Sequence, residues 1–270
     1  MNDDQGTRRV RVDVTAEIPI VETHQHLSEP GVKDRTFGWG GNHIDAILAA
    51  MDEHGVASAI LQPLGGAQDP VAVHRQIAAH AREHPGRIYG IASVNVKEFG
   101  EEATRAEFEH CVGELGFVGI KLHGFSHGIN PLSELGRVYF EAASSLGVPL
   151  MACVGAHGAP FTSPALYAYL GRRYRDLPIV FAHLDYAIAE VAIALAEEHA
   201  NIYLSSSLSI PVYLAQALET LGGDRVMLAS EDGWSIGAEI AKFVATGAAD
   251  DELEKAFSRT PRRVFGLPDG

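Results

Sequence analysis

Near its N-terminus the chain reads Ile18-Pro19-Ile20-Val21-Glu22-Thr23-His24-Gln25-His26, a short apolar run that ends in polar residues. Seven more short apolar runs follow along the chain, and longer segments separate them. Apolar runs without strict alternation are typical of strands that are buried on both faces, as in a parallel sheet. We therefore expect eight parallel strands, at Ile18–Thr23, Ala57–Gln62, Ile88–Asn95, Val118–His123, Pro149–Val154, Ile179–His183, Ile202–Ser205 and Val226–Ser230.

The segments between these runs have the apolar spacing of amphipathic helices. Glycines follow several of them, as at Gly55 and Gly147, where a left-handed residue would end the helix. Eight strand-helix units in a chain of this size favour a closed barrel over an open sheet, so we expect an α/β fold that is a single (β/α)8 TIM barrel. Its helices are expected at Ile44–His54, Val71–His84, Ala103–Leu115, Leu135–Leu146, Pro164–Arg175, Ala187–His199 and Val212–Leu221.

Length and composition fit one such barrel. The chain has 270 residues, of which 46% are hydrophobic and 21% charged, and it can bury a sizeable core. We expect one domain over residues 1–270, with an N-terminal segment at residues 1–16. Residues 27–42, which contain Phe37 and Trp39 among glycines, are a candidate lid over the active site, although packing on a neighbouring subunit would also explain them. No Gly-x-Gly-x-x-Gly turn follows the first strand, which disfavours the nucleotide-binding α/β folds.

Charge and cysteine content restrict the partners. The chain has 21 Lys and Arg against 35 Asp and Glu, a net charge of −14 that disfavours nucleic acid as a partner. No apolar run approaches the roughly 18 uncharged residues of a membrane helix, and no signal-type segment is present. Two cysteines are too few for a disulfide framework. We expect a cytoplasmic protein that acts on a small molecule and does not bind a membrane; a homo-oligomer is compatible with the sequence.

The strongest local pattern lies at the end of the first strand. Residues two apart on a strand point to the same side, so Glu22, His24 and His26 are expected to share one face. Two neutral imidazoles at this spacing can bind the same cation. The structural alternative is a pair of polar histidines with separate hydrogen bonds.

Histidines and carboxylates also end other strands. His123 ends the fourth strand, His183 the sixth, and Glu231 and Asp232 follow the eighth. Strand ends of a barrel meet at one rim, so these groups are expected to lie together. Burying each imidazole without a partner costs on the order of 1–3 kcal/mol, and a shared metal ion would remove that cost.

The fifth strand carries Cys153 where another histidine would be expected, and His157 follows in the loop. Cys153 is interpreted as a small buried hydrophobe, which makes His157 the candidate ligand, but the choice between the two stays open. Seven other histidines, among them His74 and His199, fall on helical segments or their ends and are expected to be solvated. His127 lies in a loop beside the rim, and its role stays open.

These residues carry a family resemblance. The chain resembles the amidohydrolase superfamily, in its amidohydrolase-related branch of metal-dependent TIM barrels. The matching stretches are Glu22–Leu27, Gly116–His123, Ala182–Leu184, Ala229–Asp232 and the closing Thr260–Leu267. The resemblance implies a barrel with a divalent metal bound by His24 and His26. Together, the residues and the resemblance give the candidate metal ligands Glu22, His24, His26, His123, His157, His183 and Glu231, with Glu231, His183 and Asp232 as candidate catalytic residues.

Two departures from the hydrolases of that family bear on the reaction. Cys153 stands in place of a histidine, and Glu231 stands where the hydrolases have the aspartate that acts as their base, unless Asp232 takes that position. With these departures the chain also resembles the TIM-barrel nonheme diiron monooxygenases, typified by the diterpenoid hydroxylase of platensimycin and platencin biosynthesis.

The first functional hypothesis is accordingly a monooxygenase with two iron ions, acting on a bulky apolar, diterpenoid or CoA-linked substrate in antibiotic biosynthesis. The alternatives are a zinc- or manganese-dependent hydrolase of an amide or lactone, and a decarboxylase on the same scaffold with His183 as proton donor.

Overall fold

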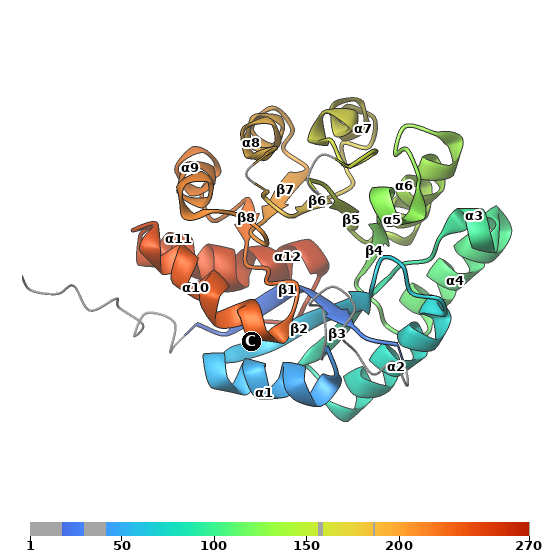
Figure 1. Cartoon of the computed structure of the whole chain (residues 1–270), viewed down its shortest axis with the longest axis horizontal. Helices are drawn as coiled ribbons and strands as arrows, with labels where there is room; N and C mark the ends of the chain where they lie inside the picture. The colour runs from blue at the N-terminus through green and yellow to red at the C-terminus, as the bar shows by residue number, and fades with distance from the viewer. Residues whose placement is uncertain (1–17, 30–41, 156–158, 186, 270) are drawn as a thin grey trace, which may run out of the picture.

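The structure is a computed structural model that describes residues 18–29, 42–155, 159–185 and 187–269. Its sheet has eight parallel strands whose order in space follows their order in the chain, and helices surround it (Figure 1). This is the TIM barrel that the sequence predicts. The strands are β1 (Ile20–Leu27), β2 (Val56–Pro63), β3 (Ile88–Ala92), β4 (Gly119–Leu122), β5 (Leu150–Cys153), β6 (Ile179–Ala182), β7 (Ile202–Ser205) and β8 (Val226–Met227).

The barrel closes between β1 and the segment that follows β8. The amide of His26 donates to the carbonyl of Glu231 (3.1 Å), and the amide of Glu231 donates to the carbonyl of His24 (2.9 Å). Gln25 and Glu231 form a parallel bridge at the same place. The residues that close the cylinder are therefore the ones that the sequence nominates for chemistry.

The helices begin and end close to the predicted positions, and α1 matches its prediction at both ends. As expected, Gly55 and Gly147 end α1 and α6 in the left-handed conformation, with φ of 68° at each. Short helices after β3 and β4, and two helices after β8, were not predicted. The α-helices are α1 (Ile44–His54), α2 (Pro70–Glu83), α3 (Val96–Phe99), α4 (Glu101–Gly113), α5 (Gly124–His127), α6 (Glu134–Leu146), α7 (Tyr167–Arg173), α8 (Ala189–Glu198), α9 (Pro211–Leu221), α10 (Ile236–Ala245), α11 (Asp250–Glu254) and α12 (Thr260–Phe265).

Two strands differ from the prediction at the site. β1 continues through His26 to Leu27 because all eight of its residues are buried between its neighbours, whatever their polarity. β8 is only two residues long, and the polar residues after it belong to a loop. Of the predicted lid at residues 27–42, residues 30–41 lie outside the described residues, as does the N-terminal segment 1–16. The amide of Ser28 donates to the carbonyl of Asn42 (3.0 Å), so the two ends of the lid segment lie together.

Two apolar layers stabilise the barrel. The larger cluster joins strand residues such as Ile120 and Phe181 to the surrounding helices. The smaller one consists of alternate strand residues, including Ile91, Met151 and Val180, together with Phe265 and its neighbours from the C-terminal helix segment. The carbonyl of Pro19, just before β1, accepts a hydrogen bond from Arg262 of α12 (3.4 Å), which places this helix at the amino ends of the strands. The opposite, carboxyl end of the barrel is the one that bears the polar groups.

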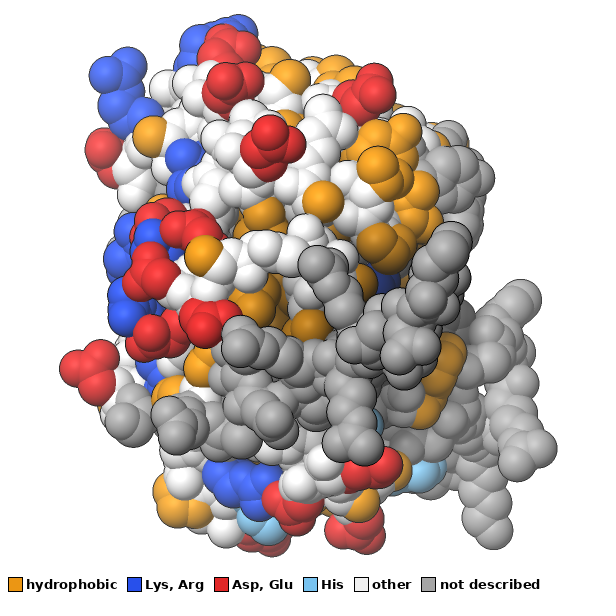
Figure 2. Space-filling view, turned by 90° about the vertical axis from the view of Figure 1, so that its left-hand side faces the viewer, with side chains coloured by type: hydrophobic (Ala, Val, Ile, Leu, Met, Phe, Trp, Pro, Cys, Tyr) orange, Lys and Arg blue, Asp and Glu red, His pale blue; other side chains and the backbone are white. Residues whose placement is uncertain are grey.

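The surface is highly charged. On the side that carries α11, acidic and basic side chains are interspersed (Figure 2), and Lys255 pairs with Asp251 (2.8 Å) and Glu252 (2.7 Å). Exposed pairs of this kind contribute little stability. Among the described helices, none has the length and apolar character needed to cross a membrane.

Phe181 offers a test of the packed outer layer. Its side chain on β6 is fully buried and packs edge-on against Tyr167, with ring centroids 5.1 Å apart. Phe181→Ala should lower the free energy of unfolding by about 3–5 kcal/mol, because it leaves a cavity. Val191→Ala, at a side chain that is 46% exposed on α8, is the control and should change it by less than about 0.5 kcal/mol. Equal effects in chemical denaturation would contradict this packing.

Candidate metal centre

Three predicted side chains meet at the carboxyl end of the barrel. His24 and His26 extend from β1, and Glu231 follows β8. Glu231 Oε1 lies 3.2 Å from His24 Nδ1, and Glu231 Oε2 lies 3.3 Å from His26 Nε2. The two histidines approach each other with their Nε2 atoms 3.2 Å apart. Each of the three offers a ligand atom within 4.8 Å of those of the others, and all are buried.

His183 joins this group from the end of β6. Its Nδ1 lies 2.8 Å from Glu231 Oε1 and 2.9 Å from the hydroxyl of Ser207, which follows β7. Both His183 and Glu231 have left-handed backbones, with φ of 79° and 77°. Such a conformation costs a residue other than glycine of order 1–3 kcal/mol, and it persists where the surrounding structure enforces it. Here the two strained residues are in contact with each other.

Lys121 is a member of the centre that was not among the predicted site residues. It lies on β4, is 1% exposed, and its Nζ is 2.7 Å from His24 Nε2. The signal was present in the sequence, since Lys121 precedes His123 by two positions at the end of an apolar strand. A lysine inside a barrel needs an anionic or hydrogen-bonding partner, and that requirement points to the rim.

Glu22 is separated from the cluster, although the sequence predicts that it shares a face with His24. The register of β1 against β2 shifts between Glu22 and Gln25, so simple alternation does not hold across this stretch. Glu22 Oε1 accepts hydrogen bonds from the amides of His24 (2.8 Å) and Ser230 (3.0 Å). Burial raises the pKa of Glu22 to about 8. In the described structure Glu22 therefore links β1 to the segment after β8.

Asp232 is occupied locally. Its Oδ1 accepts from the amide (3.1 Å) and the hydroxyl (2.8 Å) of Ser235, so Asp232 caps the helical turn after β8. Burial raises its pKa to about 6, while the bonds to Ser235 act in the opposite direction. Between the two carboxylates that the sequence left open for the strand-eight position, Glu231 is the one in contact with the histidines.

His123 and Cys153 lie on the other side of Lys121. The ring of His123 packs so closely on Gly65 that a Cβ there would come within 2.2 Å of it, and its Nδ1 accepts from the amide of Ser126 (3.3 Å). Burial raises the pKa of Cys153, but the charges of His123 and His183 and hydrogen bonds from both hold it well below its usual range. The other candidate of the fifth strand, His157, lies outside the described residues.

Burial dominates the charge states of the centre. It lowers the pKa of His24 and of His26, and the charge of Lys121 lowers both further. Burial also acts to raise the pKa of Glu231, but the charge of His183 and the hydrogen bonds from His183 and His26 hold it well below its usual value. For His183 burial acts to lower the pKa, and the charges of Glu231 and Cys153 raise it to about 10. The centre therefore combines neutral imidazoles on β1 with an ionised carboxylate.

This donor set fits a divalent cation. The Nδ1 atom of His26 faces the carbonyl of Pro63 (3.1 Å), which only accepts, so the neutral ring carries its lone pair on Nε2. That lone pair faces a carboxylate oxygen of Glu231. His24 Nδ1 and Glu231 Oε1 are buried without a hydrogen bond between them. Ligand atoms that share a cation at about 2.1 Å lie about 3.0–3.4 Å apart. The contacts of Glu231 with His24 Nδ1 (3.2 Å) and with His26 Nε2 (3.3 Å) both fall in this range.

A second group of potential ligands, His74, Glu107 and Cys111, lies between α2 and α4. His74 Nε2 accepts from the amide of Ser93 (3.0 Å), so Nδ1 carries the proton and donates to Glu107 (2.7 Å). The prediction that His74 is solvated was wrong, because it is fully buried, and His199 is only 6% exposed. Since both nitrogens of His74 are engaged, its ring holds the end of β3 in place and has no lone pair for a metal.

A family model described as amidohydrolase matches residues 21–267. A search of curated proteins found no match. Solved structures do match, among them 2,6-dihydroxybenzoate decarboxylase from Rhizobium, with a TM-score of 0.72 and 19% identity over 93% of this chain and 99% of that one.

Two further structures contain manganese. One is a dihydroxybenzoic acid decarboxylase from a Polaromonas species with bound 2-nitroresorcinol, which has a TM-score of 0.74 and 17% identity, covering 93% of this chain and 97% of that one. The other is 5-carboxyvanillate decarboxylase from Novosphingobium aromaticivorans with a nitrobenzoic acid, which has a TM-score of 0.73 and 16% identity over the same shares. At these identities the likeness establishes the shared fold. Because the family model spans nearly the whole chain, the protein belongs to the amidohydrolase family.

Proposed function

We propose that the protein is a metal-dependent decarboxylase that acts on a small aromatic carboxylic acid. The observation that carries the proposal is the engagement of Glu231 by three histidines, since this places an ionised carboxylate among metal ligands and away from the role of a base. His24, His26 and Glu231 are the proposed ligands of one divalent ion.

Glu231 is poorly suited to activate water. A general base needs a pKa near the working pH, whereas the imidazoles around Glu231 hold its pKa well below the usual value. Asp232, the other carboxylate at this position, is bound to Ser235. Loss of CO2 needs no deprotonated water, so this arrangement favours decarboxylation over hydrolysis.

The remaining groups suit a carboxylate substrate. Lys121 and His183 place positive charge on two sides of the centre and would attract an anion. A bound divalent ion would supply a Lewis acid that orients and polarises the substrate. As the carbon–carbon bond breaks, CO2 departs, the electron pair stays on the ring carbon, and that carbon takes up a proton. We assign the donor role to His183, which Ser207 and Glu231 hold in place.

The comparisons support this choice among the hypotheses drawn from the sequence. Three of the similar structures are decarboxylases, and two of them contain manganese. The diiron monooxygenase, its two iron ions and a CoA-linked substrate find no support in these comparisons. The amide or lactone hydrolase is the competing outcome of the experiment below.

Metal content tests the ligand assignment. His24→Ala and His26→Ala should each lose nearly all bound manganese or zinc in elemental analysis, because each removes one of three ligands. Circular dichroism should remain that of the folded protein. His110→Ala, at an exposed side chain on α4, is the matched control and should keep its metal. Unchanged metal content in both ligand variants would refute the site.

Product analysis tests the reaction. The manganese-loaded protein should release CO2 from a hydroxybenzoate without consuming oxygen. His183→Asn should lower kcat by about 10²–10⁴-fold, as expected for the loss of a proton donor, while the metal content is retained. Cleavage of amides or lactones without CO2 release would instead establish a hydrolase. Oxygen consumption by an iron-loaded sample would restore the monooxygenase hypothesis.

A further inference from the structure

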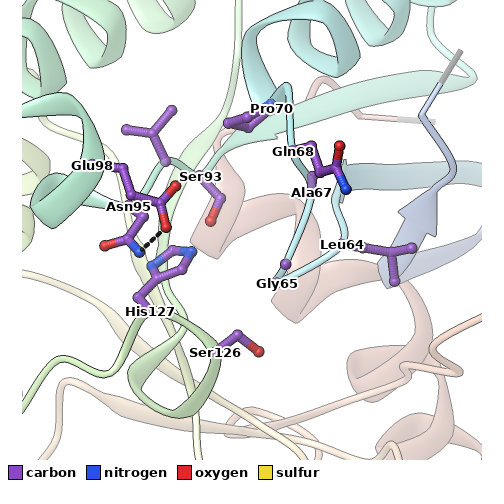
Figure 3. Close-up of a pocket in the computed structure, with 12 residues that line it drawn as sticks. Leu64, Gly65, Ala67, Gln68, Pro70, Ser93, Asn95, Glu98, Ser126 and His127 are labelled. Carbon is purple, nitrogen blue, oxygen red and sulfur yellow. Dashed lines mark hydrogen bonds between the residues drawn. The ribbon is translucent and has the colours of Figure 1, made fainter.

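A cavity of about 150 Å³ lies beside the metal centre, at the same end of the barrel. Its walls come from the loops after β2, β3 and β4. Figure 3 shows Asn95, Glu98 and His127 gathered on one side and the loop of Gly65 and Gln68 on the other. A cavity of this volume can hold one six-membered aromatic ring.

The cavity adjoins the centre through β4. Gly65, in one wall, packs directly on the ring of His123. The hydroxyl of Ser93, in another wall, donates to the carbonyl of Lys121 (3.4 Å), whose side chain contacts His24. The cavity and the centre are therefore neighbours at the end of β4.

The hydrogen bonds around Tyr139 determine which ring nitrogen of His127 can accept a hydrogen bond from a ligand. The hydroxyl of Tyr139 donates its proton to the carbonyl of Val94 (2.6 Å) and accepts from the amide of Val96 (3.2 Å). Its contact with His127 Nδ1 (3.4 Å) must therefore be one in which Nδ1 donates. The ring stacks on Tyr139, with centroids 6.3 Å apart, which fixes its orientation. The lone pair of His127 consequently lies on Nε2.

Two further polar groups of the cavity, Glu98 and Asn95, are bonded to each other. Glu98, at the exposed rim, accepts from the side-chain amide of Asn95 (3.0 Å), whose oxygen accepts from the amide of Lys97 (3.1 Å). Burial, together with the charges of His123 and Lys121, lowers the pKa of His127 to about 3, so the ring is neutral at physiological pH. The cavity thus presents a neutral acceptor and a carboxylate, a combination that repels an anion.

We propose that this cavity is a subsite that selects an uncharged hydroxyl or amino group on the substrate ring, with His127 Nε2 as acceptor. The subsite takes a donor-bearing substituent and rejects a second carboxylate. His127 is thus a specificity-determining residue. The assignment rests on the proposed function only for the identity of the reacting group, because the cavity can bind a ring on its own.

Binding of three simple probes tests the proposal. Phenol has a donor, anisole has the same ring without it, and benzoate is anionic. In titrations followed by ligand-observed NMR, phenol should bind about tenfold more tightly than anisole, the difference expected for one hydrogen bond to a site that otherwise stays unpaired. Benzoate, which is expected at the metal centre, should compete poorly with phenol for the cavity. The same order should hold in His24→Ala, which separates this result from metal binding and from activity.

Two variants test whether His127 and Glu98 are responsible for these binding preferences. His127→Phe keeps a ring to stack on Tyr139 and should abolish the preference for phenol over anisole. Glu98→Gln should weaken the rejection of benzoate, and Glu102→Gln, an exposed carboxylate on α4, is the matched control that should leave all three affinities unchanged. Equal binding of phenol and anisole to the parent protein, or an undiminished preference in folded His127→Phe, would overturn the proposal. CO2 release that fails while phenol selection persists would count against the decarboxylase alone.

Discussion

The contact of Glu231 with the histidines of β1 is the constraint on which both the barrel and its chemistry depend. The backbone of Glu231 closes the sheet by pairing with His24 and His26, while its carboxylate reaches the imidazoles of the same two residues. An isolated buried carboxylate would cost several kcal/mol, and this cost is offset by neighbouring positive charge, here His183 and, in the proposed enzyme, a metal ion. Closure of the fold and assembly of the centre are therefore one structural event.

Two other carboxylates, Glu22 and Asp232, lie near Glu231, but local hydrogen bonds hold them in other positions. The Oε1 atom of Glu22 accepts from two backbone amides, and Asp232 accepts from Ser235, so hydrogen bonds anchor both carboxylates. Glu231, by contrast, is the carboxylate that contacts the imidazoles of His24, His26 and His183. Among three acidic residues close in space, geometry thus selects one for the metal. The same selection removes the obvious base for hydrolysis.

Much of the fold follows from the sequence, because short apolar runs and glycine-ended helices are local signals. The meeting of His24, His26, His183 and Glu231 could also be predicted, since parallel strands end at one rim. Other features depend on contacts that no local pattern encodes. The register shift in β1 turns Glu22 away from His24, and His74 is buried because Glu107 and the amide of Ser93 satisfy both of its nitrogens. Lys121 lies two residues before His123 at the end of the fourth strand, but only its distance to His24 shows that it belongs to the centre.

The two ends of the proposed substrate site differ in charge, and this difference bears on the reaction. The centre is rich in positive charge from Lys121 and His183, while the adjoining cavity offers the lone pair of His127 and the carboxylate of Glu98. An aromatic acid with a hydroxyl group on its ring matches both ends in one orientation only. Its carboxylate would lie at the metal centre, where the carbon–carbon bond breaks. Its hydroxyl would lie in the cavity, where His127 Nε2 is the acceptor. A neutral amide or lactone would gain little from the positive end, so the polarity of the site favours the carboxylate substrate for the same reason that Glu231 disfavours hydrolysis.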